Sequence, residues 1–457
     1  MSASPERIQS APGSAVVGTP NAVARIHALT APVCLVLVGL GALVASLCGV
    51  ALNWDGAYYL FNLLESRQSF VANGRTTNIV LQAPTLLVQS LTGDLSILRL
   101  VFGLSYLAVP VVAVLASYLV VRRNERRLFA WAVIAITVAA LPGQMNPSSE
   151  ALQVGQLGWP ILLGAIVGLR RDDPLGAVAA LGSGLFVALG HPLGAVLLAG
   201  VAATAVLFRH RGVAIVGVAL LVLSIVSGLH TANTYEANRL TMDTVVSSFR
   251  ISLAGWVGVA LGLSTAAAAM ALIAERSRRA ALIGGCALAL ELVAGFLFLR
   301  WAHNPIVWAG AIEFRTFAAV VGVPVALVAI LDAARPSKRS AGAWRELLAM
   351  TCAAVFLGTM VIGGLTVRTI DQDLTRAMQN SSGACTAEET VPGANDTLID
   401  SWATPSRSLL LDGRQPDHIV LPQAQCGSLA QGAVPVAPWD MRASNTSGWF
   451  VLRGLTR

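Results

Sequence analysis

Charge is scarce in this chain. Only 12% of its 457 residues are charged and 55% are hydrophobic, whereas a soluble protein carries about a quarter charged residues. Lysine is nearly absent, because Lys338 is the only one. The shortage of charge argues against an ordinary soluble globular protein and indicates a chain that lies mostly in lipid.

Metal-binding cysteine patterns are missing as well. The six cysteines form no CxxC pair and no Cys/His spacing typical of zinc. The net charge of +7 comes from arginines in short clusters between apolar runs, which is how topology signals are distributed. We therefore expect no structural zinc and no nucleic-acid partner.

Long apolar runs dominate what is present. A helix needs about 20 apolar residues to cross a bilayer, and in lipid a helix satisfies its own backbone polar groups. The runs predict an all-α polytopic membrane protein with about eleven spans, and nine or ten also fit. The predicted spans are 31–52, 95–121, 128–143, 156–169, 175–190, 192–208, 213–229, 251–274, 280–299, 316–333 and 347–367.

The arginine distribution predicts the orientation. Placing the N-terminus in the cytoplasm puts most basic residues, including the clusters at 122–127 and 276–279, in inner segments, as the positive-inside rule requires. We predict a bacterial inner (plasma) membrane protein whose C-terminus lies outside the cytoplasm.

Three regions follow from this topology. Residues 1–30 form a disordered cytoplasmic N-terminus, 31–367 a transmembrane domain with a long first outer loop at 53–94, and 368–457 a small extracytoplasmic domain. An oxidising compartment would let Cys385 and Cys426 pair in that domain, and short strands such as Ser408–Leu411 are expected there.

Asp55 stands just beyond the first span, in an aromatic segment beginning at Asn53 that predicts an interfacial helix. A carboxylate there is partly desolvated and is therefore a candidate base. Aspartate is also a favoured helix N-cap, and position alone favours this capping role, which can coexist with that of a base.

The stretch from Asp55 to Arg123 resembles the N-terminal signature of the GT-C superfamily of membrane glycosyltransferases. The likeness rests on the order Asp55-Gly56-Ala57-Tyr58-Tyr59, then Ala83-Pro84, then Leu98-Arg99-Leu100, then Arg122-Arg123. The chain departs from the usual pattern at Gly56, where an acidic residue is common, and at Gln82-Ala83-Pro84, where His-Pro-Pro is common.

The resemblance implies an inverting transferase that uses a polyprenyl-phosphate-linked sugar. Asp55 would take the proton of the acceptor, which could be a glycan, a glycolipid or a protein. Glu150, in the second outer loop, matches a second acidic residue of the family, although it could equally cap a short helix. Some members use a divalent cation, which leaves a metal ion open.

Phosphate binding needs arginine at the outer interface, where its planar fork suits the ligand. The topology places Arg239, Arg250, Arg300 and Arg315 there. Each could instead extend to lipid headgroups without a ligand. Arg99, just inside its span, is expected to pack, pairing with Asp94.

Two alternatives draw on other residues. Glu291 is the one acidic residue expected deep within a span, where charge is costly and often functional, so a transporter or lipid-sugar flippase is an alternative. His191, His230 and His303 fall on the outer side, where anchoring at the interface is favoured over a metal site. A further alternative is an acyltransferase that uses His191 or His303.

Overall fold

The structure is a computed structural model that describes residues 20–71, 75–123, 125–138, 146–191, 194–231, 314–334, 344–381, 385–392, 403–411 and 419–430. These residues are mostly helical. The first half contains α1 (Pro20–Leu47), the 3-10 turn η1 (Val50–Leu52), α2 (Asp55–Ser66), α3 (Thr77–Gln89), α4 (Leu95–Val121), α5 (Arg127–Val138), α6 (Glu150–Arg170), α7 (Pro174–Gly190), α8 (Gly194–Leu207) and α9 (Arg211–Thr231). The second half contains α15 (Phe314–Ala334), α16 (Trp344–Asn380), β1 (Cys385–Ala387), η4 (Glu388–Thr390), α17 (Thr404–Leu411), β2 (Ile419–Leu421) and α18 (Gln423–Ala430).

Four described helices are long and apolar enough to cross a membrane. The candidate membrane-spanning stretches in these helices are Arg25–Leu47, Leu95–Val121, Glu150–Arg170 and Arg345–Asn380. Large apolar side chains remain exposed on three of them, as lipid-facing surfaces require. The chain is thus an α-helical membrane protein.

Each predicted apolar run that falls within the described residues coincides with a helix. In five of these helices the apolar stretch is shorter than in the four above. These helices are α5, α7, α8, α9 and α15. The predicted spans 251–274 and 280–299 lie outside the described residues. The count of about eleven spans and the orientation in the membrane stay predictions.

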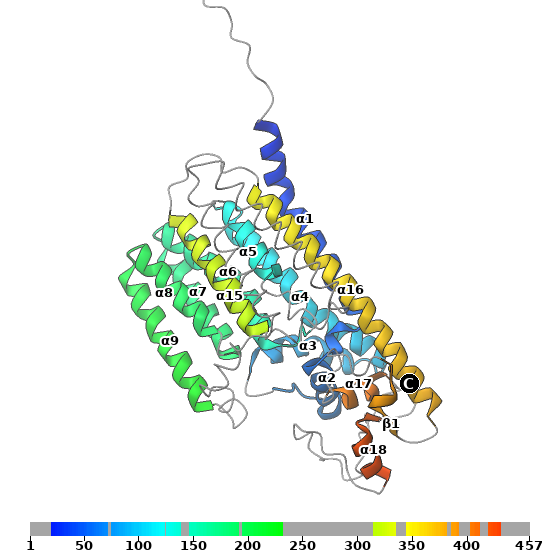
Figure 1. The fold of residues 1–457 in the computed structure, drawn as a ribbon. Helices are drawn as coiled ribbons and strands as arrows, with labels where there is room; N and C mark the ends of the chain where they lie inside the picture. The colour runs from blue at the N-terminus through cyan, green and yellow to red at the C-terminus, as the bar shows by residue number, and fades with distance from the viewer. Residues whose placement is uncertain are drawn as a thin grey trace, which may run out of the picture.

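The helices pack as a bundle (Figure 1). The longest helices, α1 and α16, run side by side, and α4 packs against α1 and α6. Helices α7, α8 and α9 form a neighbouring group against α6. The short helices α2, α3 and α17 gather at one end of the bundle, called here the α2 end.

An ion-pair cluster joins four helices at the other end. Asp332 near the end of α15 accepts a hydrogen bond from Arg345 at 2.8 Å and from the Trp131 indole at 3.2 Å. Arg127 lies 3.6 Å from Asp332, and Arg170 is paired with Glu125. The helix ends that the sequence assigns to the cytoplasmic side therefore meet in space.

The tail contains a small sheet and two short helices. β1 and β2 pair in parallel, with Cys385 opposite Ile419. The predicted strand Ser408–Leu411 is wrong, because these residues belong to α17. Strand alternation would expose every second side chain, whereas 407–410 are all buried against α2, β2 and α16.

Candidate functional site

Glu150 is the centre of a buried polar cluster at the α2 end. It is the first residue of α6 and only 1% exposed. Its Oε1 accepts hydrogen bonds from the Tyr59 hydroxyl at 2.8 Å and from Asn78 Nδ2 at 2.7 Å. Its Oε2 accepts one from Arg75 Nη1 at 2.7 Å. One carboxylate therefore ties α2, α3 and the connection between them to α6.

A second layer of hydrogen bonds supports this cluster. The Tyr106 hydroxyl of α4 donates to Asn78 Oδ1 at 2.9 Å, and Gln82 Nε2 lies 3.3 Å from the Tyr106 oxygen. Gln82 also bonds both the backbone N–H and the carbonyl of Phe70, at 2.7 and 3.0 Å. These hydrogen bonds, together with those to Glu150, attach the loop between α2 and α3 to the bundle.

Tyr59 acts as a hydrogen-bond donor in this environment. Burial and then the charge of Glu150 raise the pKa of Tyr59 well above its ordinary value, because both disfavour the phenolate. The charge of Asp55 acts in the same direction. Tyr59 thus keeps its proton, and it lies within the electrostatic influence of both candidate carboxylates, Asp55 and Glu150.

Asp55 is the first residue of α2 and is half-buried. The helix N-cap is Trp54, and no side-chain capping bond accompanies it, so the expected capping role of Asp55 is wrong. Asn146 donates to Asp55 Oδ2 at 3.4 Å, a long hydrogen bond. The carboxylate lies in the first helical turn, where the helix dipole favours negative charge.

The backbone on either side of Asp55 is unusual. Trp54 has φ 50° and ψ −125°, a region that a bulky residue adopts at a cost of about 1–3 kcal/mol. A Cβ on Gly56 would lie 1.7 Å from the carbonyl oxygen of Ala51. Glycine therefore stands where the resembled family often has an acidic residue because no side chain fits there.

The hydrogen bonds of Glu150 limit its use as a base. Both oxygens of Glu150 are engaged, by three donors that include an arginine. An acceptor proton would have to displace one of these bonds. Glu150 is therefore suited to hold the loop, and it is the start of a 21-residue helix rather than the cap of a short one.

No known protein family, curated protein or solved structure matches this chain. The GT-C resemblance stays a prediction.

A second buried cluster links the tail to the start of α2. Arg407 of α17 is 2% exposed, and its guanidinium pairs with Asp371 of α16 at 2.6 Å. It also donates to the carbonyl of Leu52 at 3.3 Å and to Asn53 Oδ1. The tail is therefore attached two residues before Asp55.

Three of the four predicted phosphate-binding arginines lie in parts of the chain that the structure does not describe. Arg239, Arg250 and Arg300 lie outside the described residues, as do Glu291 and His303. Arg315 is the second residue of α15, and its side chain is not among those described.

The histidines that could hold a metal ion are only partly within the described residues. No group of three His, Cys, Asp or Glu residues suitable for a metal ion occurs in that part of the chain. His191 follows α7 and is buried, and His230 lies near the end of α9.

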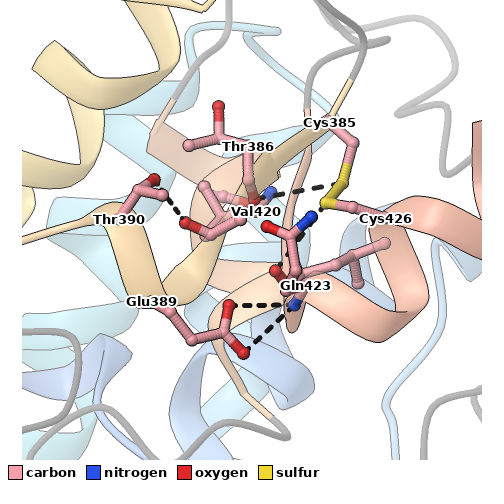
Figure 2. The surroundings of a disulfide bond; sticks show 10 residues. Cys385, Thr386, Glu389, Thr390, Val420, Gln423 and Cys426 are labelled. Atoms are coloured by element: carbon pink, nitrogen blue, oxygen red, sulfur yellow. Dashed lines mark hydrogen bonds between the residues drawn. A yellow bond between two sulfur atoms is a disulfide. The ribbon is translucent and has the colours of Figure 1, made fainter.

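The predicted disulfide between Cys385 and Cys426 is present, with a Cα–Cα distance of 5.7 Å (Figure 2). Next to it the Glu389 carboxylate accepts the backbone N–H of Gln423 at 2.9 and 3.1 Å. An open hollow of about 410 Å³ lies beside the disulfide. Asp373, Arg376, Asn380, Ser381 and Thr386 are among its lining residues.

Sequence reasoning missed several residues of these clusters. Arg75, Asn78 and Tyr106 were not singled out, nor were Asp371 and Arg407. Tyr106 and Asp371 carried a usable signal, since each is a polar group within a long apolar helix. Arg75 and Arg407 carried none, because their partners are distant in the sequence.

Proposed function

We propose that this chain is a GT-C-like membrane glycosyltransferase, which moves a sugar from a polyprenyl-phosphate donor to an acceptor hydroxyl on the outer face of the membrane. The observation that carries the proposal is the arrangement at the α2 end. Asp55 is held half-buried on a constrained backbone, and Glu150 fixes the surrounding loop through three hydrogen bonds.

The proposed step balances in atoms and charge. The acceptor hydroxyl gives its proton to the Asp55 carboxylate while its oxygen attacks the anomeric carbon of the sugar. The bond between that carbon and the phosphate oxygen breaks, and the polyprenyl phosphate leaves with the electron pair. Attack opposite to the leaving group inverts the anomeric centre, as in a single displacement.

Two features support Asp55 as the base. Its carboxylate lies half-buried in the first turn of α2, with the Asn146 amide nitrogen 3.4 Å from Oδ2. The residues before and after it leave its backbone little freedom, and a fixed base is the more effective one. The acceptor could be a glycan, a glycolipid or a protein.

The test is sugar transfer in membrane vesicles that contain the protein, with a radiolabelled polyprenyl-phosphate sugar. Asp55→Asn should lower transfer by about 100-fold or more, the usual contribution of a general base, while Asp55→Glu should retain part of it. Both variants should fold, which size-exclusion chromatography and helicity by circular dichroism would check. Unchanged transfer by Asp55→Asn would contradict the assigned role.

A further inference from the structure

The turn that leads into α2 is packed tightly and bonded to itself. The three residues of η1, Val50–Leu52, are buried. The N–H of Asn53 donates to the carbonyl of Val50 at 3.1 Å, and the N–H of Gly56 donates to the carbonyl of Asn53 at 3.0 Å. The second of these bonds encloses Trp54 and Asp55. The position of Asp55 therefore depends on how Asn53 is held.

The backbone of Trp54, directly before Asp55, is strained. Its φ of 50° and ψ of −125° lie outside the regions that a bulky residue favours. Its indole N–H has no hydrogen-bond partner among the described residues, so no bond from this group offsets the strain. Strain of this kind persists only where the surroundings hold it, and it is concentrated at functional positions. The turn therefore needs a restraint from outside itself.

Arg407 of α17 supplies such a restraint from the tail. Its Nη1 donates to the carbonyl of Leu52 at 3.3 Å and to Asn53 Oδ1, and α17 packs against α2 (Figure 1). The guanidinium is itself fixed, because Arg407 is 2% exposed and its Nε donates to Asp371 Oδ1 at 2.7 Å. Helix α16, which carries Asp371, also contacts η1. The turn is thus tied through Arg407 to both the tail and α16.

We propose that Arg407 is a positioning residue for Asp55. Through Asn53 it holds the strained turn in the conformation that places the Asp55 carboxylate at the start of α2, so that the tail of the chain keeps the base in place. The consequence for sugar transfer rests on the proposed function, whereas the hold on the turn does not.

The geometry requires an arginine at position 407. The guanidinium reaches the Asp371 carboxylate through Nε and the turn through Nη1. A lysine carries a single nitrogen on a flexible stem and lacks this planar fork. Arg407→Lys should therefore keep the charge beside Asp371 and release the turn.

The first measurement is hydrogen–deuterium exchange of the turn, with the full chain in nanodiscs. Asn53→Ala removes one acceptor of Arg407 and leaves the ion pair with Asp371 intact, so this variant should fold even if Arg407→Lys does not. The Nδ2 of Asn53 has no hydrogen-bond partner among the described residues, so no bond of that group is lost. Asn62→Ala is the matched control, because the Asn62 amide donates to the Tyr58 carbonyl within α2 at 2.7 Å.

The proposal expects backbone exchange across 52–57 to become about tenfold faster or more in Asn53→Ala, the effect of losing one hydrogen bond to a charged group. Arg407→Lys should act in the same direction. Asn62→Ala should change exchange in the turn less than twofold, and exchange in α4 should stay as in wild type. Wild-type exchange of the turn in Asn53→Ala would overturn the proposal.

The second measurement separates positioning from a purely structural role. Sugar transfer per folded molecule is compared for Asn53→Ala with Asp55 present and in an Asp55→Ala background. Displacement of the base should lower transfer about tenfold or more when Asp55 is present. It should cause no further loss once Asp55 is alanine, because the effect acts through that residue. Losses that multiply would overturn the positioning role.

The two measurements distinguish this inference from the proposed function. Wild-type protein without transfer, together with faster exchange in Asn53→Ala, would reject the transferase and keep the hold of Arg407 on the turn. Wild-type transfer that Asn53→Ala leaves unchanged would reject the positioning role and keep the transferase.

Discussion

Replacing Glu150 by alanine should destabilise the protein by about 5–7 kcal/mol. The change breaks a buried ion pair with Arg75, whose loss costs about 3–5 kcal/mol because it leaves a buried cation without its partner. It also removes the acceptor of Tyr59 and Asn78, which adds roughly 1 kcal/mol for each bond. Glu150→Gln keeps the shape and one acceptor oxygen, so it should cost about 2 kcal/mol.

A double variant identifies the source of this loss. Arg75→Met removes the cation that Glu150 pairs with, so adding it to Glu150→Gln should recover part of the stability, with a coupling of about 1–3 kcal/mol. The assay is equilibrium unfolding in mixed micelles followed by circular dichroism. A loss below about 1 kcal/mol for Glu150→Ala would refute the idea that this carboxylate holds the outer loop on the bundle.

Three further variants test other parts of the structure. Gly56→Ala should reduce the folded yield severely, because the new Cβ would lie 1.7 Å from a carbonyl oxygen. Gly155→Ala should be tolerated, because a Cβ there would have nothing within 4 Å. Size-exclusion chromatography in detergent compares the folded yields of the two variants. Arg407→Met should cost about 3 kcal/mol in unfolding experiments, because it leaves the largely buried Asp371 carboxylate without this partner. Arg376→Met, at a side chain 65% exposed, should cost less than about 1 kcal/mol. Equal losses in the two variants would refute the contrast. Cys385→Ser opens a loop of sequence separation 41, worth about 4 kcal/mol of chain entropy, so limited proteolysis should cut the tail faster than in wild type; an unchanged digestion rate would contradict a stabilising disulfide.

The helices could be predicted because the bilayer imposes a local rule. Twenty apolar residues need no distant partner to become a helix in lipid, and runs such as 95–121 coincide with α4. The disulfide was also predictable, since Cys385 and Cys426 were the only cysteines in the polar tail. The strand expected at 408–411 failed because its burial comes from three surrounding elements.

The candidate site was predictable only in part. Asp55 was singled out by its place just beyond the first span and then matched a family pattern, whereas Glu150 was found through that likeness. The residues that fix them are joined across long separations: Arg75 and Glu150 are 75 residues apart, and Arg407 and Asn53 are 354 apart. Pairings of this kind depend on the packed bundle, so no local pattern in one sequence reveals them.

The role of Asp55 can be measured most directly by chemical rescue. Asp55→Ala is assayed for sugar transfer with and without added formate, which can supply a carboxylate in place of the missing side chain. The account predicts a loss of about 100-fold or more, with transfer rising in proportion to formate in this variant and not in wild type. Transfer by Asp55→Ala at the wild-type rate, or a deep loss that formate never relieves while the protein stays folded, would contradict Asp55 as the base.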